Sequence, residues 1–322
     1  MLPRCSKRSN RGGCIQERIR QIRIMTVQVL ISDDLTPLAR KFGAKVTDFF
    51  EESFGLARRY RQRFQTGARL LDGVYDAAIT LSPARLRLDR RSQKRNILVT
   101  GIEVPNREGQ IHSVIDTMTK GTRHAITKSV IPMEDRGKFS NIDAAISLVP
   151  GSIDSFDWII IVDDDVTFPY RFLDLFIAIS EAADFSIVQP SHCFNSYATF
   201  RITQRRFATL ARQTRFVEIG PLTALRRDTF ANLIPFPESR WCYGIDVYWT
   251  WIAEQHGWKM GIVDATPVNH LRPVARSYDK NAAYAEGAAF LKEKQIALRR
   301  KELLADDRVA VPWLSIGSAT GS

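Results

Sequence analysis

Residues 157–165 read Asp-Trp-Ile-Ile-Ile-Val-Asp-Asp-Asp, and this stretch decides the fold class. The run Trp158–Val162 is too apolar for anything but a buried strand. Strands buried on both faces occur mainly in parallel sheets that helices cover. Asp163, Asp164 and Asp165 follow at the carboxyl end of this strand, which is where open α/β sheets bind their ligands.

Three adjacent carboxylates in such a place repel one another, and burial disfavours their charged forms. The arrangement makes sense chiefly if a cation offsets the charge. Carboxylate oxygens at residues i and i+2 of an extended segment lie on one side and suit Mg²⁺ or Mn²⁺ shared with a diphosphate. The alternative is an acidic loop that caps a helix starting near Phe168, because aspartate is favourable at helix N-termini.

Beyond residue 95, short apolar runs alternate with helix-like patterns, which predicts an α/β fold with a mostly parallel mixed sheet flanked by helices. The expected strands are 97–100, 125–131, 158–162, 185–189, 216–219 and 260–263. The expected helices are 139–148, 170–182, 246–256 and 280–304, the last with a weak point at Gly287.

The positive charge of the chain lies in its N-terminal region, residues 1–95, which is called the basic front below. Residues 1–95 hold 21 Lys and Arg against 9 Asp and Glu, a net charge of +12, whereas the remaining residues have a net charge of −1. A solvated tail and an Arg-rich helix face explain this without any partner. The alternatives are contact with anionic lipid head groups and, less favoured, with nucleic acid.

Four segments are expected along the chain. Residues 1–24 form a basic tail with too little apolar content to order. Residues 25–95 form a basic helical extension, in which 38–63 has the spacing of an amphipathic helix. Residues 96–275 form the α/β domain, and residues 276–322 a C-terminal helix and flexible tail.

Two further features bear on where the chain resides. No apolar run of about 18 residues and no signal sequence is found, so we expect a cytoplasmic protein. The cysteines are too few and too scattered for a disulfide framework or a zinc site, and we expect free thiols. They are Cys5, Cys14, Cys193 and Cys242.

Three stretches together resemble the GT-A superfamily of glycosyltransferases. Residues 136–145, Arg-Gly-Lys-Phe-Ser-Asn-Ile-Asp-Ala-Ala, resemble the Gly-Lys-x-x-Asn helix that precedes the strand carrying a D-x-D motif. Residues 241–249, Trp-Cys-Tyr-Gly-Ile-Asp-Val-Tyr-Trp, resemble the helix start that carries the base of inverting members, although family-two enzymes usually have Glu-Asp there. Residues 263–270, Val-Asp-Ala-Thr-Pro-Val-Asn-His, resemble the region that supplies a metal-binding histidine.

The resemblance spans residues 96–275 and also fits an uncharacterised branch with Gly-x-Asp-x-x-Trp followed by His-x-x-Pro. It implies a GT-A-type, Rossmann-like domain that moves a sugar from a nucleotide-sugar donor to an acceptor hydroxyl with the help of Mn²⁺ or Mg²⁺. A UDP-sugar is favoured over a GDP-sugar. Asp163, Asp165 and His270 would form the metal site, and Asp246 would be the general base of an inverting reaction. A helix N-cap is the alternative role for Asp246.

Further contacts are assigned by the same resemblance and by position. Candidate contacts to the donor are Thr100, Gly101, Arg136, Lys138, Asp163, Asp164 and Gly220. The first two end a strand where the backbone can approach a nucleotide, and the basic pair can bind phosphate or base. Trp241 and Tyr243 are candidates for stacking on a sugar in the acceptor site. The basic front favours a lipid-linked or otherwise anionic glycan acceptor at the inner face of the membrane.

Three rival interpretations remain. Residues 162–167 also fit the D-x-D-x-T signature of haloacid-dehalogenase-type phosphatases, with Asp163 as nucleophile, but those enzymes usually carry the motif on their first strand. Gly121-Thr122-Arg123 faintly resembles a nucleotidyltransferase loop, yet it leads into a strand rather than a helix. A non-catalytic protein that binds an anionic partner through residues 1–95 is the third.

Overall fold

The structure is a computed structural model that describes residues 67–272, 279–298, 303–304 and 307–312. The expected basic tail 1–24 and amphipathic helix 38–63 lie outside the described residues, as do Cys5 and Cys14. Cys193 and Cys242 are free thiols. Among the described helices, none combines the length and the apolar character that crossing a membrane would require.

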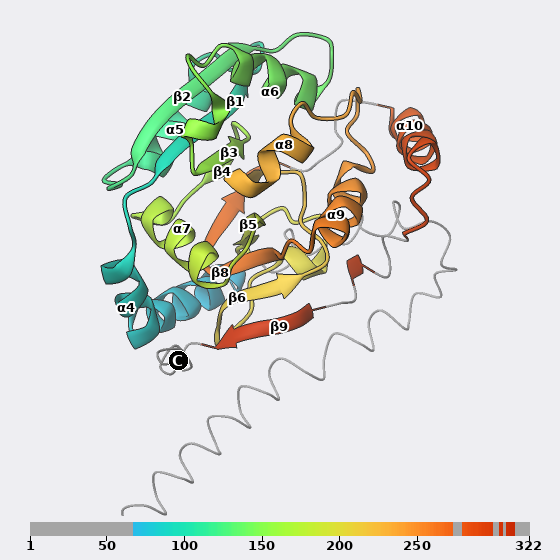
Figure 1. The fold of residues 1–322 in the computed structure, drawn as a ribbon. Helices are drawn as coiled ribbons and strands as arrows, with labels where there is room; N and C mark the ends of the chain where they lie inside the picture. Colours follow the sequence, from blue (N-terminus) through green and yellow to red (C-terminus); the bar gives the residue numbers. More distant parts are fainter. Residues whose placement is uncertain (1–66, 273–278, 299–302, 305–306, 313–322) are drawn as a thin grey trace, which may run out of the picture. The chain divides into compact units, whose positions relative to one another are not determined.

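A nine-stranded mixed sheet forms the centre of the described chain (Figure 1). Its order is β2-β1-β3-β7-β5-β8-β6-β9, and β4 pairs with β8. Only β4, β6 and β7 run against the direction of the other strands. The strands are β1 (Asn96–Glu103), β2 (Ala125–Pro132), β3 (Trp158–Val162), β4 (Val166–Thr167), β5 (Ile187–His192), β6 (Thr209–Thr214), β7 (Leu222–Arg226), β8 (Met260–His270) and β9 (Asp307–Pro312).

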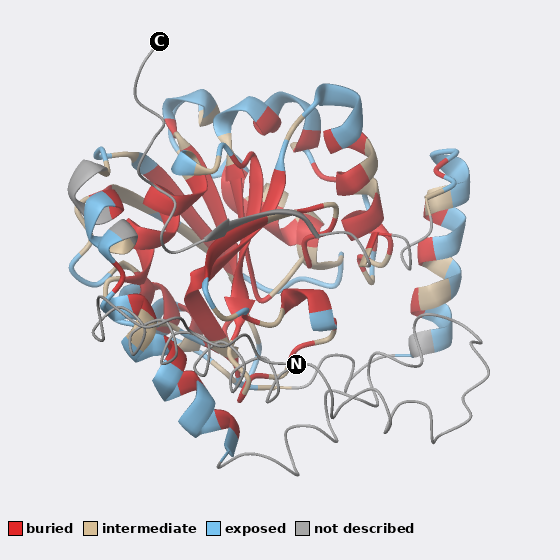
Figure 2. Ribbon diagram, turned by 90° about the horizontal axis from the view of Figure 1, so that it is seen from below, coloured by how far each residue is buried: buried red, intermediate tan, exposed pale blue. Residues whose placement is uncertain are grey.

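Helices cover both faces of this sheet, and the strands are buried between them (Figure 2). The helices are α4 (Pro83–Arg91), α5 (Gln110–Thr119), α6 (Lys138–Ser147), α7 (Phe172–Ala182), α8 (Phe230–Leu233), α9 (Ile245–His256) and α10 (Lys280–Glu293). Successive side chains of a strand point to opposite faces, so Ile160 packs with α5 and α7 whereas Ile159 and Ile161 pack with α6 and α9. The predicted class, α/β with a mostly parallel mixed sheet flanked by helices, is confirmed.

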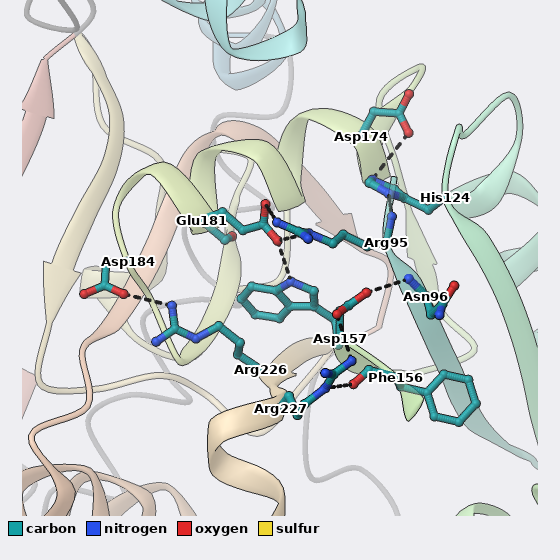
Figure 3. A network of polar contacts seen from close by, with 12 residues as sticks. Arg95, Asn96, His124, Phe156, Asp157, Asp174, Glu181, Asp184, Arg226 and Arg227 are labelled. Carbon is teal, nitrogen blue, oxygen red and sulfur yellow. Dashed lines mark hydrogen bonds and ion pairs between the residues drawn. The ribbon is translucent and has the colours of Figure 1, made fainter. Parts of the chain in front are cut away.

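The amino end of β3 is held by a network of ion pairs and hydrogen bonds (Figure 3). The guanidinium of Arg95 lies 2.6 Å from Glu181, which also accepts a hydrogen bond from the indole of Trp158. Asp157 accepts from the backbone N–H of Asn96 and pairs with Arg227. These contacts fix where β3 begins, and therefore where its carboxyl end meets the cavity described below.

Most predicted elements are found within one to three residues of their expected ends, but segment 216–219 is not a strand. Phe216 and Val217 are fully buried, yet they pack into different parts of the core in the connection between β6 and β7. A short buried apolar run cannot be assigned to a strand by composition alone. The strand before it, β6, was missed because it carries Arg212, which is fully buried against Asp264 at 2.8 Å.

The C-terminal end of the described chain differs from expectation, whereas its N-terminal end is helical as expected. The helix expected over 280–304 ends at Glu293, and β9 adds an unexpected edge strand to β6. At the front, residues 67–80 are helical and lead into α4. Gly287, the expected weak point of the C-terminal helix, is required there, because an added Cβ would lie 2.8 Å from Cβ of Tyr243.

Candidate functional site

A cavity of about 500 Å³ opens at the carboxyl ends of the three parallel strands β1, β2 and β3. Its walls combine apolar side chains with a few polar ones. The lining residues used below are Ile102, Val104, Met133, Lys138, Asp163, Asp164 and Trp241. Volume, mixed lining and position at the strand ends are those of a small-molecule site in an open α/β sheet.

Asp163 faces Lys138 at the floor of this cavity. The Lys138 ammonium lies 2.6 Å from Oδ1 of Asp163 and donates a hydrogen bond to the carbonyl of Ile219. The backbone N–H of Asp163 donates to the carbonyl of Pro221 at 2.8 Å. An added Cβ on Gly220 would lie 2.7 Å from Oδ2 of Asp163, so any larger residue would displace this carboxylate.

Asp164 is paired with two arginines that were not among the candidates. Nη1 of Arg107 lies 2.8 Å from Oδ1, and Nη1 of Arg272 lies 3.9 Å from Oδ2. Burial raises the pKa of Asp164 above its ordinary value, with Arg107 opposing and Asp165 adding to the effect. Protein cations therefore offset part of the charge of Asp163 and Asp164. The expectation that a metal ion offsets the charge of the triplet stays a prediction.

Asp165 contacts His270, as the metal-site prediction requires. Strand pairing of β4 with β8 sets Val166 opposite His270, and Nε2 of the imidazole lies 3.1 Å from Oδ1 of Asp165. Nδ1 of His270 lies 3.2 Å from the carbonyl oxygen of Tyr197. A carbonyl only accepts hydrogen bonds, so Nδ1 carries a hydrogen and a neutral ring would present its Nε2 lone pair toward Asp165.

The electrostatics of this pair are strongly coupled. Burial is the largest single effect on each pKa and opposes charge on both groups, yet the hydrogen bond between them and the surrounding charges together outweigh it. The pKa of His270 is raised and that of Asp165 is lowered. These shifts favour the charged form of both groups, and a metal ion would have to replace the proton on Nε2.

The donor atoms of Asp165 and His270 fit a divalent cation. Metal–ligand bonds of about 2.1 Å at right angles place neighbouring ligand atoms about 3 Å apart, which matches the Nε2 to Oδ1 separation. Among the described residues, no three His, Cys, Asp or Glu side chains gather into a complete ligand set. A cation such as Mg²⁺ is usually bound through one or two protein carboxylates, with phosphate oxygens and water in its remaining positions.

Of four further predicted contact residues, one lines the cavity and three pack against other parts of the protein. Trp241 lines the cavity, whereas Tyr243 packs edge-on against Tyr284 of α10. Thr100 is fully buried in β1, and an added Cβ on Gly101 would meet Ile111 at 2.6 Å, so both serve the core.

Two predicted charged residues lie outside the lining of the cavity. Arg136 lies 3.3 Å from Glu134. Asp246 is 4 % exposed in the first turn of α9, where its Oδ1 accepts a hydrogen bond from the N–H of Val247. That contact agrees with a helix-start role.

Asn141 and Arg107 are functional candidates that the sequence reasoning missed. Asn141 is 1 % exposed, and its amide donates to the carbonyls of Glu134 and Gly137 at 2.8 Å, which fixes the turn that presents Lys138. The Gly-Lys-x-x-Asn spacing on one helix could have identified it. No comparable pattern marks Arg107, which reaches Asp164 from the loop between β1 and α5.

Comparison with known proteins gives similarity to solved structures alone. No family model matches the sequence, and no curated protein matches it. GalNAc-T7, solved with UDP, GalNAc and Mn²⁺, shares 11 % identity over 61 % of this chain and 50 % of its own, with a TM-score of 0.42. The mannosyltransferase PcManGT from Pyrobaculum calidifontis, in complex with GDP-Man and Mn²⁺, shares 16 % identity over 77 % of this chain and 80 % of its own, with a TM-score of 0.42.

A third structure, A197 from STIV, shares 12 % identity over 55 % of this chain and 86 % of its own, with a TM-score of 0.36. The chain matches half the length of the GalNAc-T7 chain. Because these identities and TM-scores are low, the function is inferred from the chain's own residues.

Proposed function

We propose that this protein is a metal-dependent glycosyltransferase that moves a sugar from a nucleotide-sugar donor to an acceptor hydroxyl. The observation that carries the proposal is the contact between Asp165 and His270, which joins an acidic triplet to a histidine 105 positions away. The other two carboxylates of the triplet, Asp163 and Asp164, line the cavity. Buried side chains of opposite charge with a ligand-sized cavity beside them are typical of functional sites.

The cavity suits a nucleoside diphosphate in its distribution of polarity. Ile102, Val104 and Met133 provide an apolar wall on which a base can lie. Lys138 and Arg107 sit beside the acidic triplet, where the two phosphates would bind, and each can exchange a carboxylate partner for a phosphate oxygen. A UDP-sugar remains the favoured donor over a GDP-sugar.

Asp165 and His270 would hold the cation, with Asp163 contacting it directly or through water. A bound Mn²⁺ or Mg²⁺ neutralises the charge that develops on the departing diphosphate. Asp246 remains the proposed base of an inverting transfer. Its carboxylate is 4 % exposed, so this role requires a path for the acceptor hydroxyl to open.

The rival activities receive less support. Asp163 follows the third strand in chain order, which lies between β1 and β7, whereas the phosphatase motif usually belongs on a first strand. The residues that resembled a nucleotidyltransferase loop have a structural role, because Thr122 and Arg123 both donate hydrogen bonds to the buried carboxylate of Asp174. A non-catalytic binder would not need a cavity at the acidic triplet.

A peripheral membrane location and a lipid-linked or glycan acceptor are part of the proposal. The described portion of the basic front exposes Leu70, Val74 and Leu81, which are 73 %, 55 % and 78 % exposed. An apolar stripe beside arginines suits the interface of an anionic membrane. Binding to vesicles that contain phosphatidylserine but not to neutral vesicles is expected, and equal binding to both would contradict the electrostatic part of this account.

A thermal-shift panel of nucleotides and sugar nucleotides, with and without Mn²⁺, tests the function. A ligand present at a hundred times its Kd adds about 2.7 kcal/mol of stability, so the true donor will raise the melting temperature only when Mn²⁺ is present. Asp165→Ala should abolish the Mn²⁺-dependent part of the rise in melting temperature. Asp154→Ala, at an exposed position in a short helical turn, is the matched control. Stabilisation that ignores Mn²⁺, or that survives Asp165→Ala, would refute the assignment.

A further inference from the structure

The helical segment 67–80, which belongs to the basic front of the chain, packs on the loop that follows β5. The ring of Tyr75 makes edge contacts with Phe194 and Phe207, with centroids 5.2 and 4.9 Å apart. The guanidinium of Arg205 lies over the same ring at 5.2 Å. This segment is therefore docked on residues 193–207 by apolar and cation–π contacts together.

Asp72 forms the polar centre of this docking. It is 8 % exposed, and it accepts hydrogen bonds from the backbone N–H groups of Phe194 and Asn195 at 3.0 and 3.1 Å. Nη1 of Arg205 lies 3.2 Å from its carboxylate, and the Arg205 side chain is fully buried. One carboxylate thus fixes two consecutive peptide groups of the loop, more than 120 positions away in the sequence.

The next two residues of that loop hold His270. The hydroxyl of Ser196 accepts a hydrogen bond from the backbone N–H of His270 at 2.8 Å. The carbonyl of Tyr197 orients the imidazole through Nδ1 at 3.2 Å, and the N–H of Tyr197 donates to the carbonyl of His270 at 3.1 Å. Ser196 and Tyr197 thus contact both the backbone and the ring of His270, in addition to Asp165 and the strand pairing. The ring of His192 lies beside the imidazole as well, with centroids 6.2 Å apart.

We infer that Asp72 is a positioning residue for the candidate metal site, acting through residues 194–197 on His270. The inference rests on the proposed function, because it assigns to the front of the chain a part in building the metal site. Groups that orient a metal-binding histidine usually matter to metal affinity although they do not touch the metal. The helical extension would then be a component of the active centre as well as a basic surface.

Mn²⁺ binding to the purified full-length chain, measured by the electron paramagnetic resonance of free Mn²⁺, tests the inference without any turnover. Asp72→Asn leaves one acceptor oxygen for two N–H groups and removes the partner charge of Arg205. We expect at least a tenfold loss of Mn²⁺ affinity. Asp76→Asn is the control, because Asp76 lies on the same helix and also pairs with Arg205 but is 59 % exposed. It should bind Mn²⁺ as the wild type does.

Hydrogen–deuterium exchange of peptides covering 194–197 and 268–271 gives a second, metal-independent readout. Asp72→Asn should speed exchange in both peptides, and Asp76→Asn in neither. If Asp72→Asn does not fold, Asp72→Glu, which keeps the charge but shifts the carboxylate by one methylene, should show a smaller change in the same peptides. Unchanged exchange at 268–271 in a folded variant would overturn the inference. Faster exchange in a protein that binds no Mn²⁺ would support the coupling and refute the metal-dependent function.

Discussion

The Lys138 ammonium lies 2.6 Å from the carboxylate of Asp163, and Gly220 closes the other side of that ion pair. Lys138 begins α6 and Asp163 follows β3, so two elements that the sequence orders as helix then strand meet in one charge pair. A lysine held against a carboxylate at the floor of a cavity can change partner when a phosphate arrives, and the first predictions concern this exchange.

Lys138→Gln should raise the KM for the donor about tenfold or more. The substitution removes a charge-assisted contact of about 1.5–3 kcal/mol and leaves the rest of the cavity in place. Steady-state kinetics over a range of donor concentrations will measure it. Lys128→Gln is the control, since Lys128 pairs with Asp116 on the surface. A donor KM equal to that of the wild type would show that Lys138 only neutralises Asp163.

Gly220→Ala should weaken donor and Mn²⁺ binding while costing little stability. The new Cβ would lie 2.7 Å from Oδ2 of Asp163 and 3.2 Å from Nζ of Lys138, so these flexible side-chain ends must move. Calorimetric titration and thermal unfolding separate the two effects. Gly73→Ala, where nothing lies within 4 Å, should leave binding unchanged and stabilise its helix by up to about 1 kcal/mol. Equal binding by both variants would argue against a tight fit at Gly220.

Gly287→Ala should destabilise the protein by about 1–3 kcal/mol and raise the KM for the acceptor. The added methyl would meet Cβ of Tyr243 at 2.8 Å and push α10 away from the segment that carries Trp241. Glu286 of the same helix also accepts a hydrogen bond from the N–H of Trp241 at 3.1 Å. Ala288→Gly, at an exposed position, should cost about 1 kcal/mol through helix propensity but spare the acceptor KM.

The loss of a proton from Asp143 should lower the free energy of unfolding as the pH rises from about 4 to 6. Burial raises the pKa of this carboxyl to about 6, against 3.8 for an ordinary aspartate, although the N–H of Phe236 opposes the shift. In this window the folded state binds the proton more tightly than the unfolded state, so unfolding becomes easier as the proton leaves. Asp143→Asn cannot ionise and should lose this part of the pH dependence. Urea unfolding at pH 5 and pH 8 measures the change in the free energy of unfolding between these two pH values. The same change in the wild type and in Asp143→Asn would contradict the prediction.

The sequence was sufficient to predict elements whose patterns are local. The strand Trp158–Val162 and the helices beginning near Phe172 and Ile245 have apolar runs or helical spacing with clear ends. The contact of Asp165 with His270 agrees with the resemblance, which assigned both residues to one metal site.

The contacts that the sequence did not predict depend on long-range packing. Arg212 looks like a surface residue in the sequence, yet Asp264 on the neighbouring strand allows it to lie fully buried in β6. Arg107 and Asp72 likewise acquire their roles only through partners 57 and more than 120 positions away. No local periodicity reports such partners, so neither residue could be selected before the fold was known.

Anomalous diffraction from crystals grown with Mn²⁺ and a nucleoside diphosphate tests the central claim most directly. The account predicts a manganese peak at Asp165 and His270, with the diphosphate beside it in the cavity between Lys138 and Asp163. A manganese peak elsewhere, or a nucleotide bound without contact to the acidic triplet, would contradict it.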